Sequence, residues 1–99
     1  MKIRLEDFWG RNIEHDGFIL KAKDAYESAR NIEDILVRTA GWFRAPKPLH
    51  YLELRKQYKA LVPGMETHYP GVVDLIIQPE ILKQLGFPVD GNGMVHYPV

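Results

Sequence analysis

Cysteine is absent from the 99 residues, and serine occurs only once, as Ser28. Without thiols the chain has no disulfide framework, no thiolate nucleophile and no metal–sulfur site. Ser28 lies inside a predicted helix, whereas a serine hydrolase places its nucleophile on a strained turn between a strand and a helix. Covalent acyl transfer is therefore strongly disfavoured as a function.

Long apolar runs are also lacking, and none approaches the ~20 residues that a membrane-spanning helix needs. The first residues carry charges at Lys2, Arg4 and Glu6 and lack the apolar core of a signal peptide. We therefore expect a cytoplasmic protein without a membrane partner.

The composition that remains is that of an ordinary globular domain, with 45% hydrophobic and 26% charged residues. A chain of this length forms one domain, so we predict a single domain over residues 1–99. Apolar periodicity predicts a small α+β fold built around a central helical pair, over about 24–40 and 48–61. Short strands are expected to pack against this pair.

The first helix is predicted from a capping box at Asp24 and Glu27, and Gly41 is a natural stop. Its apolar stripe has helical spacing and comprises Ala25, Ala29, Ile32 and Leu36. The second helix is expected to begin at Pro48, which suits a first helical turn. Its stripe comprises Tyr51, Leu54, Tyr58 and Leu61.

Before the helical pair, the alternation at residues 2–6 predicts a short strand. The Asp16-Gly17 turn predicts a hairpin whose second strand covers 18–23. A competing interpretation starts the first helix at Asp16 and continues it to Ala40.

After the pair, residues 65–71 are predicted as a loop, and the β-branched run 72–77 as a strand. Pro79 and Gly86 delimit a short helix over 79–85. Residues 87–97 are expected to form a C-terminal hairpin around the turn 90–93.

Two aromatic pairs stand beside arginine in predicted connectors. They are Phe8-Trp9-Gly10-Arg11 and Trp42-Phe43-Arg44. Trp and Arg are enriched at binding hot spots, and connectors often carry binding residues. Each tryptophan has two interpretations, since its ring either fills the core or anchors a partner. Leu49 and Leu52 lie off the helical stripe, which indicates either two-sided burial or a contact with a partner, including a second copy.

From these features we predict a non-catalytic module that acts by stoichiometric protein–protein contact, as a small inhibitor, adaptor or regulatory subunit. The candidate partner-binding residues share aromatic, cationic or exposed apolar character and comprise Trp9, Arg11, Trp42, Phe43, Arg44, Leu49 and Leu52. The partner is expected to be a protein, and a homodimer is also considered.

The alternative is a nucleic-acid-binding regulator. Residues 38–60 carry a formal charge of +5 and include aromatic rings, although the whole chain has net charge zero. The cations that would contact phosphates are Arg44, Lys47, Arg55, Lys56 and Lys59. A pI near 6.9 is below the basic range expected of a dedicated binder.

A small acid–base enzyme is the third hypothesis. Glu14-His15-Asp16 supplies suitable side chains, but neighbouring residues of a turn diverge into solvent. No His-x-His or His-x₃-His spacing occurs, so we predict no metal site and no cofactor. A metal site would require the fold to bring His50, His68 and His96 together with Glu66.

Overall fold

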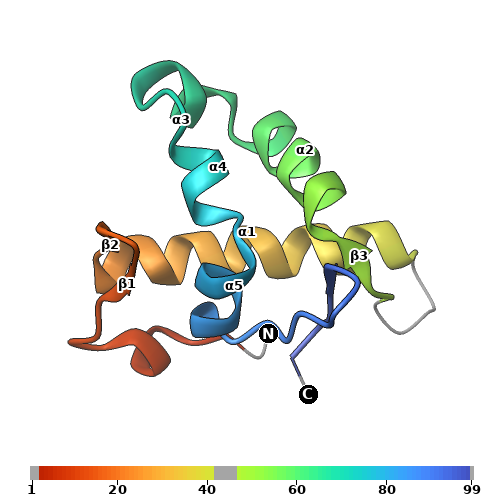
Figure 1. Cartoon of the computed structure of the whole chain (residues 1–99), viewed down its shortest axis with the longest axis horizontal. Coiled ribbons are helices and arrows are strands. Elements are labelled where there is room, and N and C mark those ends of the chain that lie inside the picture. Colours follow the sequence, from red (N-terminus) through yellow and green to blue (C-terminus); the bar gives the residue numbers. More distant parts are fainter. Residues whose placement is uncertain (1–2, 42–46, 99) are drawn as a thin grey trace.

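The computed structural model describes residues 3–41 and 47–98. It confirms the α+β class and the central helical pair, α1 (Ala22–Ala40) and α2 (Tyr51–Leu61). Figure 1 shows α1 running along the molecule, with α2 and α4 (Val72–Ile76) rising from it. Two antiparallel two-stranded sheets complete the fold. No helix of the described residues is both long and apolar enough to cross a membrane.

Helix α1 buries the predicted stripe completely, with Ala25, Ala29, Ile32 and Leu36 all inaccessible to solvent. The helix begins at Ala22, earlier than predicted, because the Asn12 side chain accepts a hydrogen bond from the Ala22 N–H at 3.3 Å. The Asp24 capping box is therefore wrong.

The hairpin before α1 is confirmed. Strand β1 (Ile13–His15) pairs with β2 (Phe18–Leu20), which is shorter than the predicted 18–23. The competing long helix from Asp16 is wrong, because Asp16 adopts a positive φ of 51° in the turn between these strands. The Gln84 side chain donates to the Glu14 carbonyl at 2.8 Å and so covers the open edge of β1.

Helix α2 begins at Tyr51 rather than at Pro48. The preceding residues form β3 (Leu49–His50), which pairs with β4 (Met94–Val95). The His50 ring then caps α2, because its Nδ1 accepts from the Leu52 N–H at 3.2 Å. Tyr58 is fully buried, and its hydroxyl donates to the Ser28 hydroxyl at 3.4 Å. The single serine of the chain thus joins α1 to α2.

The predicted strand over residues 2–6 is wrong. Leu5–Phe8 form a 3₁₀ helix, η1, in which the Asp7 carboxylate accepts from the Arg4 N–H at 3.1 Å. The alternation of Ile3 and Leu5 does not mark one buried face, since Ile3 is buried and Leu5 is exposed. The turn instead places the Phe8 ring in the core.

The predicted loop 65–71 and strand 72–77 are also wrong. Pro63–His68 form α3, and the apolar run forms α4. Val73, Ile76 and Ile77 are all buried, at spacings that one side of a helical turn can present. A strand here would need a neighbouring strand for its backbone groups, whereas a helix satisfies them internally. Tertiary packing therefore overrides the β-branched composition.

The last two predicted elements are confirmed. Helix α5 covers Pro79–Leu85, as expected from its Pro and Gly boundaries. In the C-terminal hairpin, Val89 bridges Val95, and the Asp90 N–H donates to the Met94 carbonyl at 3.1 Å. The hairpin then extends through β4 to β3, which attaches it to the start of α2.

Gly93 is the point where this hairpin meets α2. Its φ is +80°, and a Cβ atom placed there would lie 2.9 Å from Nε2 of His50. We expect Gly93→Ala to lower the free energy of unfolding by about 1–3 kcal/mol in urea denaturation, through backbone strain and this clash. Gly91→Ala is the matched control, because a Cβ atom there has no neighbour within 4 Å and the backbone φ is ordinary. Equal stability of the two variants would contradict the close approach of His50.

Candidate binding surface

Trp9 immediately follows η1, and 80% of its surface is exposed. Beside it lies an open pocket of about 400 Å³. The pocket is lined by the described residues Leu5, Phe8, Trp9, Gly10, Ala22 and Lys23. Leu5 is also exposed, at 43%, whereas Phe8 belongs to the core. The core interpretation of Trp9 is therefore wrong, and the ring forms part of an apolar surface that we call the Trp9 surface.

Arg11 lies next to the Trp9 surface. Its guanidinium carbon is 5.5 Å from the centre of the Phe8 ring, and its Nη2 donates to the Gln84 carbonyl at 3.5 Å. Arg11 therefore holds the connector between η1 and β1 against α5. Arg11 is nevertheless exposed, so a partner could reach its side chain.

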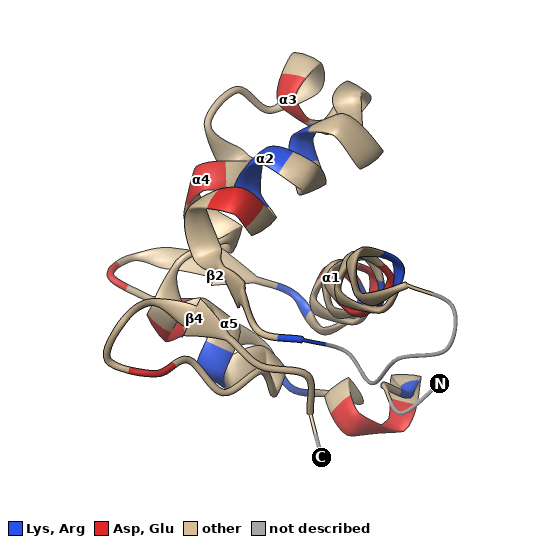
Figure 2. Ribbon diagram, turned by 90° about the vertical axis from the view of Figure 1, so that its right-hand side faces the viewer, with Lys and Arg blue, Asp and Glu red and all other residues tan. Residues whose placement is uncertain are grey.

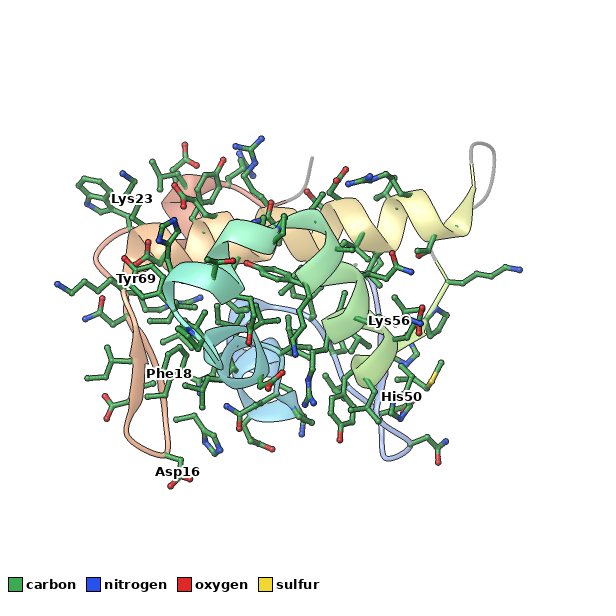
Figure 3. All side chains as sticks on the ribbon, turned by 90° about the horizontal axis from the view of Figure 1, so that it is seen from above. Asp16, Phe18, Lys23, His50, Lys56 and Tyr69 are labelled. Carbon is green, nitrogen blue, oxygen red and sulfur yellow. The ribbon has the colours of Figure 1, made fainter. Side chains whose placement is uncertain are left out.

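Leu49 and Leu52 lie at the opposite end of the molecule. Figure 3 shows Lys23 and Tyr69 at one end and His50 and Lys56 at the other. Leu49 packs against the core from β3, whereas Leu52 is 50% exposed on α2. The two leucines therefore do not form one exposed patch. Trp42, Phe43 and Arg44, the other predicted partner-binding residues, lie outside the described residues.

The basic segment is partly neutralised within the fold. Lys59 Nζ lies 3.1 Å and Arg55 Nε 3.4 Å from the Asp74 carboxylate of α4. Figure 2 shows the basic positions of α2 beside the acidic position of α4. Lys47 and Lys56 are exposed, and Arg44 lies outside the described residues. Arg55 and Lys59 are thus held by an acidic neighbour that the sequence spacing did not reveal.

His50 and His96 take part in separate local contacts. His50 caps α2, whereas His96 Nε2 lies 3.1 Å from Oδ2 of Asp90 across the C-terminal turn. The hydrogen bond from His96, followed by those from the Met94 and Asn92 N–H groups, lowers the pKa of Asp90. Over residues 3–41 and 47–98, no three His, Cys, Asp or Glu side chains are grouped as a metal site requires.

Sequence reasoning missed the contact between Tyr97 and Glu33. Glu33 is almost completely buried in α1, and the Tyr97 hydroxyl donates to its Oε2 at 3.1 Å. Burial raises the pKa of Tyr97, and the neighbouring Glu33 carboxylate raises it further. A glutamate at position 33, beside the buried Ile32, was the only sequence signal for a polar partner in the core.

Because of this contact between Tyr97 and Glu33, we expect the free energy of unfolding to depend on pH in the alkaline range. A phenol whose pKa is raised by folding stabilises the protein below the ordinary pKa of about 10, and that stability is lost as pH rises through the higher folded pKa. We expect the unfolding free energy of Tyr97→Phe to fall less between pH 9 and 11 than that of the wild type. Tyr69→Phe, at an exposed site, is the control and should follow the wild type. Parallel curves for all three proteins would contradict the raised pKa of Tyr97.

The Trp9 surface is the described feature that best fits a binding role, because it combines an exposed aromatic ring with an adjacent apolar pocket. Comparisons of the chain with protein-family models, with curated proteins and with solved structures find no match.

Proposed function

We propose that the chain is a non-catalytic binding module that acts by stoichiometric contact with another protein, as an inhibitor, adaptor or regulatory subunit. The observation that carries this proposal is the 80% exposure of Trp9 beside an apolar pocket. Binding hot spots are enriched in tryptophan and often lie at pockets.

The free energy available from burying the Trp9 ring is large enough for Trp9 to be the main contact with a partner. A tryptophan side chain offers roughly 150–250 Å² of surface, and burial of apolar surface contributes about 25 cal/mol per Å². Covering this mostly exposed ring would therefore contribute about 3–5 kcal/mol before the costs of association. One ring can thus supply much of the affinity of a small interface.

The nucleic-acid alternative has weaker support. Arg55 and Lys59 already interact with Asp74, so only part of the basic segment is available to phosphates. Lys47 and Lys56 are exposed and remain candidates. The acid–base enzyme hypothesis was based on Glu14-His15-Asp16, which lie at the turn end of the β1–β2 hairpin, with Glu14 and Asp16 exposed. The His96–Asp90 pair offers the same residue types, but it ties together the C-terminal turn. The cytoplasmic location and the homodimer stay predictions.

The two leading functions can be separated by two binding measurements. Purified wild type and Trp9→Ala serve as baits in a lysate of the source cells, and a protein retained only by the wild type is identified, purified and titrated back. A reconstituted one-to-one complex would support the proposal. A second titration uses mixed-sequence DNA and RNA at two salt concentrations. Micromolar binding that weakens steeply with salt, without a reconstituted protein partner, would favour the nucleic-acid alternative instead.

A further inference from the structure

The chemistry of the Trp9 surface limits what its partner can be. Leu5, Phe8, Trp9, Gly10 and Ala22 give the pocket a largely apolar lining, and Lys23 is the ionisable residue among its described lining residues. A cavity of roughly 150 Å³ is large enough for a benzene-sized group. The open pocket of about 400 Å³ therefore has room for one bulky aliphatic or aromatic side chain together with neighbouring backbone.

The polar groups at this pocket are donors. Lys23 is exposed, and within residues 3–41 and 47–98 its ammonium group has no carboxylate within ion-pair distance. The Trp9 indole N–H likewise has no acceptor among the described residues. Figure 3 shows Lys23 at the outer edge of the molecule, where its side chain is open to a partner. A lysine places its apolar stem along a wall and its ammonium group at the rim.

Neither acidic residue of η1, Glu6 or Asp7, forms an ion pair with Lys23. The Asp7 carboxylate accepts from the Arg4 N–H at 3.1 Å and so serves the start of η1. The Arg11 guanidinium lies over the Phe8 ring but donates to the Gln84 carbonyl of α5, and Arg11 is not among the described residues that line the pocket. The pocket therefore combines an apolar lining with two donors, the Lys23 ammonium group and the Trp9 indole N–H, neither of which has a partner among the described residues.

We propose that the partner of the Trp9 surface presents a bulky apolar side chain next to a side-chain carboxylate, in an acidic segment of a protein. The apolar side chain enters the pocket, and the carboxylate accepts from Lys23 Nζ and the indole N–H. This inference rests on the proposed function, since it specifies the chemistry of that same protein partner.

The probes are end-blocked hexapeptides that differ at two positions. The parent peptide contains Asp-Leu within a neutral, flexible sequence, and its matched variants contain Asn-Leu or Asp-Ala. Binding is followed by ¹⁵N–¹H spectra of the full chain, in which Trp9, Gly10 and Lys23 report on the pocket. We expect the parent peptide to shift these signals, the Asn-Leu peptide to bind about fivefold more weakly, and the Asp-Ala peptide to bind at least tenfold more weakly.

Lys23→Gln tests the role of the charge, because it keeps a polar N–H donor on a side chain only one atom shorter and removes the positive charge. It should abolish the preference for Asp-Leu over Asn-Leu without abolishing apolar binding. Lys56→Gln, an exposed lysine at the other end of the molecule, should leave the preference unchanged. Binding that does not distinguish Asp from Asn, or binding of anionic vesicles at these signals instead of peptides, overturns the inference.

This test is distinct from that of the proposed function. A reconstituted protein complex that depends on Trp9 but not on Lys23, together with equal binding of the three peptides, would leave the protein-binding function intact and refute the acidic-segment partner. Failure to reconstitute any Trp9-dependent protein complex would refute the proposed function. A peptide with Leu at a free C-terminus is an added arm, and its tighter binding than the end-blocked parent would overturn the assignment to a side-chain carboxylate.

Discussion

Trp9→Ala is expected to lower the affinity for the reconstituted protein partner by about 30-fold or more, which corresponds to the loss of at least ~2 kcal/mol at a hot spot. The reason is that 80% of the ring surface is exposed in the free protein and available for burial in a complex. The dissociation constant is measured by isothermal titration calorimetry. The unfolding free energy of the variant should stay within about 0.5 kcal/mol of the wild type, since an exposed ring contributes little to the core.

Leu52→Ala is the matched control for this experiment. Leu52 is also an exposed apolar residue, at 50%, but it lies on α2 at the end of the molecule opposite Lys23. Its replacement should change the dissociation constant less than about twofold if the partner uses the Trp9 surface. A large loss of affinity in Leu52→Ala, with none in Trp9→Ala, would move the binding site to the start of α2.

Phe87→Ala is expected to destabilise the protein by about 3–5 kcal/mol, the range for removing a buried aromatic ring from a core. Phe87 is completely buried and follows Gly86, whose φ of 104° ends α5 and turns the chain inward. The Phe87 N–H donates to the Leu82 carbonyl at 3.0 Å, so the backbone fixes the point at which the ring enters the core. Because small domains have only about 5–15 kcal/mol of stability, this loss is a large share of the total.

Urea denaturation followed by circular dichroism measures this effect, and the slope of the transition should not change. Tyr69→Ala is the control, because it also removes an aromatic ring, but from a position that is 68% exposed. We expect that control to lose less than about 0.5 kcal/mol. A loss below 1 kcal/mol in Phe87→Ala would show that its ring is not packed as the structure describes.

Part of the candidate site could be predicted from the sequence. Trp9 and Arg11 were identified because aromatic and arginine residues in a connector are typical of binding surfaces. Leu5 was instead assigned to a strand, and Lys23 was not singled out. These two residues reach the pocket only because η1 lies against the start of α1, a contact between segments that are separated in the chain.

The distribution of charge on the surface could likewise be predicted only in part from the sequence. The sequence shows a basic segment at residues 38–60, but it does not show which carboxylates approach it. Asp74 reaches Arg55 and Lys59 only because residues 72–76 form a helix beside α2 rather than a strand. The sequence therefore gives the net charge of a segment, whereas the fold decides how much of that charge faces solvent.

The sequence by itself determined those helices whose position depends on residues close together in the chain. The stripe of α1 follows from side-chain spacing, and the ends of α5 follow from Pro79 and Gly86, because helical period and φ preference act within a few residues. The tertiary structure alone decided that the run 72–77 is helical and that Trp9 is exposed. A short apolar run or a large ring gains its free energy from the surface it covers, and that surface is supplied by distant parts of the chain.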